Sequence, residues 1–262
     1  MSGANGAAAA PLVVDRLSLA FGGIQVLHDI AVRLEPGEIT GLIGPNGAGK
    51  TSFFNCLTGL YSPQRGTIRL GERQLEGLPP PQRAALGFSR SFQHVALCPE
   101  LSIAENVTIG LDRQSSAGWL DAFLPLPRGA EERARNRETA LAALARLGIA
   151  EVADHAPAQL PPGMLRLAEI ARAIAGAPRV LLLDEPAAGL NSVETRDLSA
   201  ALAKLRSPDL VLVVVEHDMD LIMDVCDTIH VLNAGRVLAS GSPAQIRVDP
   251  EVVRVYLGDD DE

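Results

Sequence analysis

The stretch Gly44-Pro45-Asn46-Gly47-Ala48-Gly49-Lys50-Thr51 decides how this chain of 262 residues folds. It follows a short apolar stretch at residues 39–43 and precedes a helical pattern at residues 52–60. Glycines let a backbone wrap an anion without Cβ clashes, and the amide N–H groups and positive end of the next helix face that anion. The spacing Gly-x4-Gly-Lys-Thr therefore predicts a phosphate-binding loop and a nucleotide site.

The residue types of this loop match the chemistry of a nucleoside triphosphate. The charge of Lys50 can reach the β- and γ-phosphates, and the hydroxyl of Thr51 can ligate Mg²⁺. The residues expected to bind the nucleotide here are Gly44, Asn46, Gly47, Gly49, Lys50, Thr51 and Ser52. The alternative is a glycine-rich turn before a helix, but the apolar strand upstream favours the nucleotide interpretation.

A pair of acids ends a second apolar stretch, at residues 180–183. Successive side chains of a strand point to opposite faces, so the two acids can have different tasks. We expect Asp184 to hold Mg²⁺ and Glu185 to polarise an attacking water. The alternative is a strand with a polar end, which the phosphate loop upstream makes less favourable.

Two further residues are candidates for contact with the nucleotide. His217 follows the apolar stretch 210–215 and can reach a γ-phosphate at the mouth of the sheet; alternatively it starts a helix with Asp218 as N-cap. Gln93 carries a neutral amide that can ligate Mg²⁺ or orient water. His94, beside it, is expected on a surface loop.

The pattern of the remaining chain predicts an α/β fold. Strands at residues 180–184, 210–215 and 228–232 alternate with helices at 193–205 and 219–225, which favours a parallel sheet with crossover helices. The other expected elements are antiparallel strands at 12–21 and 25–34, a strand at 66–70, a loop at 72–82, and helices at 103–111, 131–147 and 164–175. The helices from about residue 92 to 176 are expected to form an inserted helical subdomain.

Composition excludes several classes of protein. The chain has 23 Lys and Arg against 32 Asp and Glu, a formal net charge of −9, which argues against nucleic-acid binding. No apolar run approaches the roughly 18 residues of a membrane span. We expect a disordered lead-in at residues 1–11, one large domain at 12–258, an acidic tail at 259–262, and a cytoplasmic location.

The order of these elements resembles the ATP-binding subunit of ABC transporters, from about residue 12 to residue 258. The Walker A loop is residues 44–51, the Q-loop is Ser91-Phe92-Gln93, and the Walker B strand is residues 181–184. The resemblance implies ATP and Mg²⁺ as ligands, Glu185 as catalytic base and His217 as switch histidine. It also implies a P-loop NTPase core with a mixed sheet, an N-terminal antiparallel β-subdomain and the helical insert. Phe21 stands where the family stacks an aromatic ring on adenine.

One subfamily is matched more closely, the branched-chain amino-acid importer ATPases of the LivG type. The matching stretches are residues 21–23, 99–107, 186–191, 216–219 and 256–258. Lipopolysaccharide-export ATPases and importers of urea and other amides have overlapping motifs and stay open as alternatives.

The chain departs from the family at the signature motif. The family reads Leu-Ser-Gly/Tyr-Gly-Gln, whereas this chain reads Leu160-Pro161-Pro162-Gly163-Met164. In the family that serine donates to the γ-phosphate held by the opposite subunit, and proline has neither a hydroxyl nor a backbone N–H. The resemblance thus implies a degenerate signature acting in trans, with impaired hydrolysis as an alternative.

The implied partners follow from the resemblance. They are transmembrane permease subunits, a second ABC ATPase as heterodimer in preference to homodimer, and a solute-binding protein in the wider system, with no nucleic acid. The implied place is peripheral, on the cytoplasmic face of a bacterial inner membrane. ABC ATPases of translation carry two modules in one chain and those of DNA repair carry long coiled coils, and neither feature is visible here. A regulatory subunit that binds ATP but barely hydrolyses it remains a further alternative.

Overall fold

The computed structural model describes residues 10–91, 97–114 and 127–257, and these fall into two units. The sheet unit comprises the described residues of Met1–Arg90, Arg179–Pro186 and Arg206–Glu262, and the helical unit comprises those of Ser91–Pro178 and Ala187–Leu205. Most of the expected lead-in and all of the expected acidic tail lie outside the described residues.

The larger sheet of the sheet unit has six strands in the order β10-β9-β3-β8-β7-β6. Its strands from β9 to β6 pair parallel, and β10 pairs antiparallel with β9. Every residue of β3, β7 and β8 is buried, which explains why the sequence shows continuous apolar runs there. The bounds are β3 Ile39–Ile43, β6 Phe88–Arg90, β7 Val180–Asp184, β8 Val211–Val215, β9 Thr228–Asn233 and β10 Arg236–Gly241.

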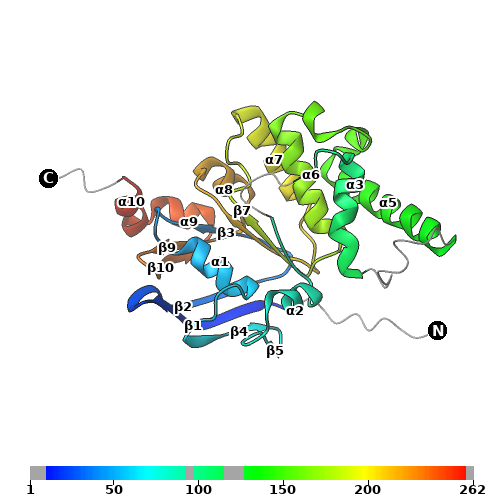
Figure 1. The fold of residues 1–262 in the computed structure, drawn as a ribbon. Coiled ribbons are helices and arrows are strands. Elements are labelled where there is room, and N and C mark those ends of the chain that lie inside the picture. The colour runs from blue at the N-terminus through cyan, green and yellow to red at the C-terminus, as the bar shows by residue number, and fades with distance from the viewer. Residues whose placement is uncertain (1–9, 92–96, 115–126, 258–262) are drawn as a thin grey trace. The chain divides into compact units, whose positions relative to one another are not determined.

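The smaller sheet is antiparallel, with the order β2-β1-β4-β5. Its strands are β1 Leu12–Phe21, β2 Ile24–Leu34, β4 Arg65–Leu70 and β5 Arg73–Gln74. Helix α1 (Lys50–Thr58) lies between the two sheets (Figure 1), and its Phe53 and Phe54 belong to one core with residues of both. The mixed sheet and the antiparallel subdomain confirm the expected fold class.

The prediction of a loop at residues 72–82 is wrong, because that stretch contains β5 and the start of α2 (Pro80–Ala85). A stretch rich in Pro, Gly and charge favours a loop, but Pro80 occupies the first turn of α2, where its fixed φ suits a helix. The sheet unit also contains α8 (Met219–Val225), α9 (Pro243–Val248) and α10 (Pro250–Leu257).

Arg83 of α2 is almost fully buried and holds the C-terminal end of α1. Its Nη1 donates to the carbonyl oxygens of Cys56 and Leu57 at 2.6 and 2.8 Å. Its Nη2 and Nε donate to the carbonyl oxygens of Leu75 and Leu78 at 2.9 and 3.0 Å. Burial lowers the pKa of this guanidinium, and the carbonyl oxygens compensate the buried charge.

The substitution Arg83→Met should therefore destabilise the protein by about 2–4 kcal/mol, because four carbonyl groups each lose a donor while the side-chain volume is kept. The carbonyls of Cys56 and Leu75 keep a backbone donor, from the N–H groups of Gly59 and Leu78. Chemical denaturation followed by circular dichroism measures this loss. Arg73→Met, at an exposed position of β5, is the matched control and should stay within about 0.5 kcal/mol of the parent. Equal stabilities of the two variants would contradict the capping role of Arg83.

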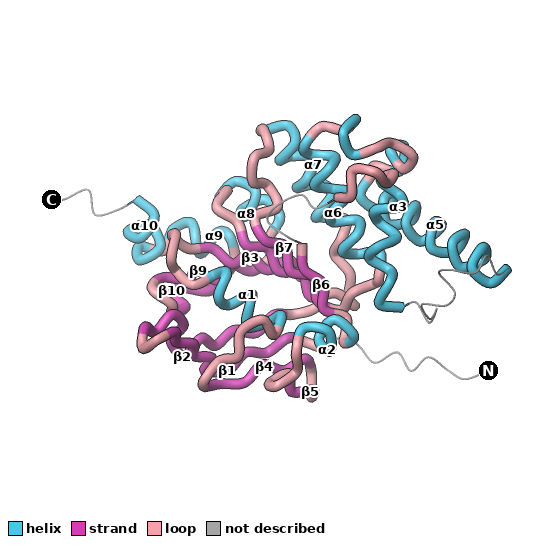
Figure 2. Tube along the Cα trace, viewed as in Figure 1, coloured by secondary structure: helices cyan, strands magenta, loops and turns pink. Residues whose placement is uncertain are grey.

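Among its described residues the helical unit has helices and no strand (Figure 2). α6 is its centre, since it packs against α3, α5 and α7, and its Leu167, Ile170 and Ala171 are buried. No helix in the described part of the chain is both long and apolar enough to cross a bilayer. The elements are α3 Ile103–Thr108, η1 Ile109–Gln114, α5 Pro127–Leu147, η2 Ala150–Val152, η3 Pro157–Gln159, α6 Pro162–Ala175 and α7 Ser192–Ala203.

Candidate nucleotide site

The phosphate loop joins β3 to α1, between a strand and a helix as the sequence predicts. Gly44 has a φ of 152°, and a Cβ there would lie 2.1 Å from the carbonyl oxygen of Leu232, so only glycine fits. Gly49, with a φ of 103°, is the N-cap of α1. The first amide N–H groups of α1 have no partner within the helix, so an anion in the loop can accept from them.

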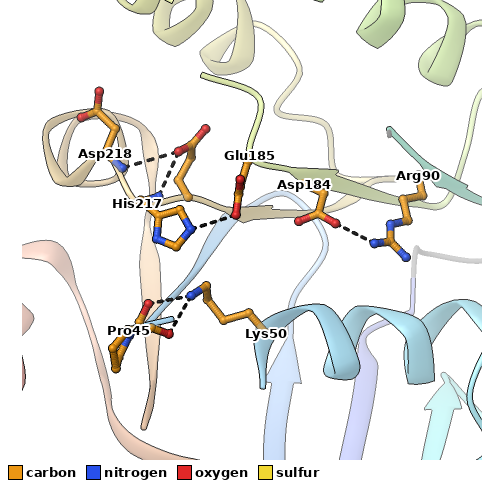
Figure 3. Close-up of polar contacts among 9 residues, drawn as sticks. Pro45, Lys50, Arg90, Asp184, Glu185, His217 and Asp218 are labelled. Atoms are coloured by element: carbon orange, nitrogen blue, oxygen red, sulfur yellow. Dashed lines mark hydrogen bonds and ion pairs between the residues drawn. The ribbon is translucent and has the colours of Figure 1, made fainter. Parts of the chain in front are cut away.

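Lys50, the first residue of α1, folds back over the loop. Its Nζ donates to the carbonyl oxygens of Gly44 and Pro45 at 2.6 and 3.1 Å (Figure 3). Burial lowers the pKa of Lys50, and the negative charges of Glu185 and Asp184 act in the opposite direction. The ammonium group is thus held inside the loop within electrostatic range of both predicted acids.

The two acids differ in environment, although not through the alternation expected of a strand, because only Asp184 belongs to β7. Asp184 ends β7 and its side chain is 1% exposed, whereas Glu185 has left the strand and its side chain is 27% exposed. Glu185 has a φ of 49°, a left-handed conformation that costs energy for a residue with a side chain. Its N–H donates to the carbonyl oxygen of Val215 at 2.8 Å, which holds this turn against β8.

His217 lies at the end of β8 and faces Glu185. The Nε2 of His217 and the Oε1 of Glu185 are 2.8 Å apart (Figure 3). The buried carboxylate of Glu216 accepts from the N–H of His217 at 2.9 Å and so fixes the backbone that carries the imidazole. Asp218 accepts from the N–H of Leu221 as the N-cap of α8, so the expected helix start and the pairing with Glu185 occur together.

Arg90 is a site residue that the sequence analysis missed. Its Nη2 donates to the Oδ2 of Asp184 at 2.6 Å, and its Nη1 donates to the Oδ1 of Asn55 in α1 at 2.6 Å. The guanidinium also lies over the ring of Phe54, 5.7 Å from the centroid. The only signal in the sequence is its place three residues before Gln93, where nothing local indicates a pairing with Asp184.

The other predicted contact residues lie on the loop, on α1 or at the end of β1. Asn46, Gly47 and Thr51 are exposed and Ser52 is half-buried, so all of them are open to a ligand at the start of α1. Phe21 ends β1 with 45% of its surface exposed, and its ring meets Tyr61 edge-on at a centroid distance of 5.0 Å. Its stacking on adenine stays a prediction. Gln93 and His94 lie outside the described residues.

The altered signature lies in the helical unit, at the start of α6. Pro161 is the N-cap of α6 and gives it no side-chain hydrogen bond, and Pro162 is the first residue of the helix. The N–H of Gly163 donates to the Oε1 of Glu194 at 2.9 Å, and a Cβ on Gly163 would lie 2.9 Å from the Cγ of Glu194. The N–H groups of Asn191 and Gly163 hold the pKa of Glu194 below its usual value.

A glycine loop between a buried strand and a helix, a lysine inside it and two acids at the end of another strand of the same sheet define a P-loop nucleotide-binding protein. The chain matches the sequence model of the ABC transporter family over residues 27–188. A second model, for the branched-chain amino acid ATP-binding cassette transporter, matches residues 236–262.

Relatives and solved structures agree with these matches. The chain is 43% identical to the high-affinity branched-chain amino acid transport ATP-binding protein LivG of Salmonella typhimurium, over 95% of this chain and 98% of that protein. It is 35% identical to the lipopolysaccharide export system ATP-binding protein LptB of Acidithiobacillus ferridurans, over 89% and 91%. A solved ATP-binding cassette of an ABC transporter in its ADP conformation has a TM-score of 0.81 and 25% identity, over 95% of this chain and 99% of that one.

The chain therefore belongs to the ABC transporter family, as an ATP-hydrolysing cassette of that family. The predicted resemblance and its LivG-type branch are both confirmed. Nucleotide binding and a permease as membrane partner come with this membership.

Proposed function

We propose that this chain powers the import of branched-chain amino acids, or of a similar small polar solute, across a bacterial inner membrane. The cluster of Lys50, Asp184, Glu185 and His217 in the sheet unit carries this proposal, because it contains what ATP hydrolysis needs. The likeness to LivG supports the substrate class. Lipopolysaccharide export is the second candidate, favoured by the weaker likeness to LptB, and the match at residues 236–262 argues for the importer.

The residues of the sheet unit suit ATP and Mg²⁺. The exposed hydroxyl of Thr51 and the carboxylate of Asp184 are hard oxygen donors of the kind that Mg²⁺ prefers, and Gln93 is the third proposed ligand. Bound Mg²⁺ would neutralise negative charge on the phosphates. Lys50 would exchange its two loop carbonyls for phosphate oxygens, while Phe21 presents an exposed ring to the adenine.

Hydrolysis itself is proposed to depend on the pair of Glu185 and His217. Glu185 accepts a proton from the attacking water, and its left-handed backbone turns the carboxylate away from the path of β7. His217, 2.8 Å from that carboxylate, orients it and can donate to the γ-phosphate when ATP is bound. Asp184 holds the metal and takes no proton in this scheme.

The proposed partners explain where this chain is located and how ATP hydrolysis is coupled to transport. Permease subunits hold the chain on the cytoplasmic face of the membrane, and a solute-binding protein delivers the substrate. A groove of about 320 Å³ between α3 and α5 is the proposed seat of a permease segment. It is lined by the exposed Ile109 and by charged side chains of both signs, Glu105, Arg133 and Arg137, which suits an amphipathic segment. The proposed second ATPase is a related chain rather than a copy.

Lys50→Ala tests the proposal. The variant should bind ATP·Mg²⁺ about 10- to 100-fold more weakly, because one charged donor to the phosphates is lost. Titration with a fluorescent ATP analogue measures the affinity, and the exposed Lys204→Ala serves as the control, with an unchanged affinity.

The same pair of variants tests transport. Liposomes that contain the permease, this chain and its ATPase partner, with ATP on the side of the two ATPases and the solute-binding protein on the opposite side, should take up labelled leucine when this chain is native or Lys204→Ala. They should fail with Lys50→Ala. Unchanged ATP affinity of Lys50→Ala would reject the nucleotide site. Export of lipid in place of leucine uptake would favour the second candidate.

A further inference from the structure

A clip of three side chains connects two of the elements that carry the proposed Mg²⁺ ligands. Arg90, the last residue of β6, donates through one nitrogen to Asp184 of β7 and through another to Asn55 of α1, both at 2.6 Å. A guanidinium has donors in a fixed planar fork, so two bonds to two acceptors set the distance between those acceptors. The clip therefore fixes β7 relative to α1 at the level of Asp184.

Asn55 connects this clip to the other proposed ligand. Thr51 and Asn55 are four residues apart in α1, which places them one above the other on the same face of the helix. The helix face that carries the Thr51 hydroxyl thus also carries the anchor of Arg90. Arg90 thus holds the elements that carry Thr51 and Asp184 relative to one another through its bonds to Asn55 and Asp184.

The position of Arg90 suits a supporting role. In Figure 3, Arg90 approaches Asp184 from the side opposite Glu185 and His217. It is bonded to the Oδ2 of Asp184, and its side chain is 17% exposed beside a carboxylate that is 1% exposed. A buried carboxylate held at one oxygen by a charged donor cannot turn freely, so the direction of its other oxygen is fixed as well.

We propose that Arg90, anchored by Asn55, is a positioning residue that orients Asp184 for Mg²⁺. This inference rests on the proposed function, in which Asp184 is a metal ligand. Outer partners that orient a ligating side chain commonly change metal affinity by about 10- to 100-fold when they are removed. The positive charge of Arg90 would by itself repel Mg²⁺, so orientation and charge predict opposite effects on metal affinity when Arg90 is replaced.

The test uses Mg²⁺-dependent binding of a fluorescent ATP analogue to the full chain. Arg90→Lys keeps the charge but cannot reach both acceptors, and Arg90→Gln removes the charge. In both variants the half-saturating Mg²⁺ concentration should rise about tenfold, while binding of the analogue in EDTA stays unchanged. Asn55→Ala should shift it in the same direction by less, and it carries the test if an Arg90 variant fails to fold.

Two controls make the outcome decisive. Arg206→Lys alters another arginine–aspartate pair of the sheet unit, with Asp227, and should leave the Mg²⁺ requirement unchanged. Asp184→Asn should raise it. The positioning role is overturned if Asp184→Asn raises the half-saturating Mg²⁺ concentration while folded Arg90 and Asn55 variants do not. It is also overturned if Arg90→Gln lowers that concentration. In both cases the proposed function stands. If Asp184→Asn has no effect, the metal role of Asp184 fails and this inference fails with it.

Discussion

Glu185→Gln should lower ATP turnover by at least about 100-fold while ATP·Mg²⁺ remains bound, since the amide keeps the shape of the side chain but accepts no proton. The partner of His217 would then be a neutral amide at the same place, 2.8 Å from Nε2 in the native pair. Steady-state phosphate release measures turnover, and analogue titration measures binding. Because ATP then stays uncleaved, the variant should also accumulate the ATP-bound dimer, which size-exclusion chromatography detects.

Two comparisons separate this assignment from its alternative. Asp184→Asn should lose Mg²⁺-dependent binding along with turnover, because Asp184 is the proposed metal ligand. Glu151→Gln, an exposed acid of the helical unit, should change neither quantity. Substantial steady-state hydrolysis by Glu185→Gln, in the assembly that is active for the parent, would show that another group accepts the proton.

The parts of the fold that local patterns encode were predictable. The strand expected at residues 180–184 and the helix expected at 219–225 agree with β7 and α8 at both ends. Strands buried on both faces leave a continuous apolar run, and Gly44 and Gly49 mark a turn whose backbone excludes other residues. For the same reason the lysine and the acid pair could be chosen from sequence alone.

The features that the sequence analysis missed are of two kinds. Some depend on contacts between residues far apart in the sequence, and others have a local sequence signal that the analysis did not use. Arg90 and Asp184 are 94 residues apart, and Arg83 donates to Cys56 across 27 residues, so neither pairing leaves a periodic trace. By contrast, Ser242 forms a capping box with Gln245 at the start of α9, a local signal that the sequence does contain. The left-handed backbone of Glu185 could not be foreseen, since that conformation is uncommon for residues other than glycine.

Restoring the signature should raise the ATPase rate of this chain on its own by about 100-fold, from the roughly 2–4 kcal/mol that one donor to a developing anionic charge supplies. The double variant is Pro161→Ser with Met164→Gln. Pro161 has φ −69° and ψ 159° at the N-cap of α6, an extended conformation that serine adopts readily at helix starts. Met164 is half-buried next to it, so glutamine there can reach solvent or a ligand. Pro161→Ala with Met164→Ala is the matched control, because it removes the ring without adding a donor.

The same variant distinguishes a homodimer from the proposed heterodimer. In a pair of identical chains both ATP sites would use the altered signature, so restoration should act on both and give the full gain. With a related ATPase whose signature is intact, the site that combines this chain's Lys50, Glu185 and His217 with the partner's signature already works. Restoring the signature of this chain then activates only the opposite site. The ATPase rate rises at most about twofold, because one of the two sites already has all its γ-phosphate donors. Phosphate release from the chain alone and from the mixed complex measures both cases. No gain over the alanine control in either setting would mean that Pro161 and Met164 are tolerated, and the argument for two unequal sites would fall.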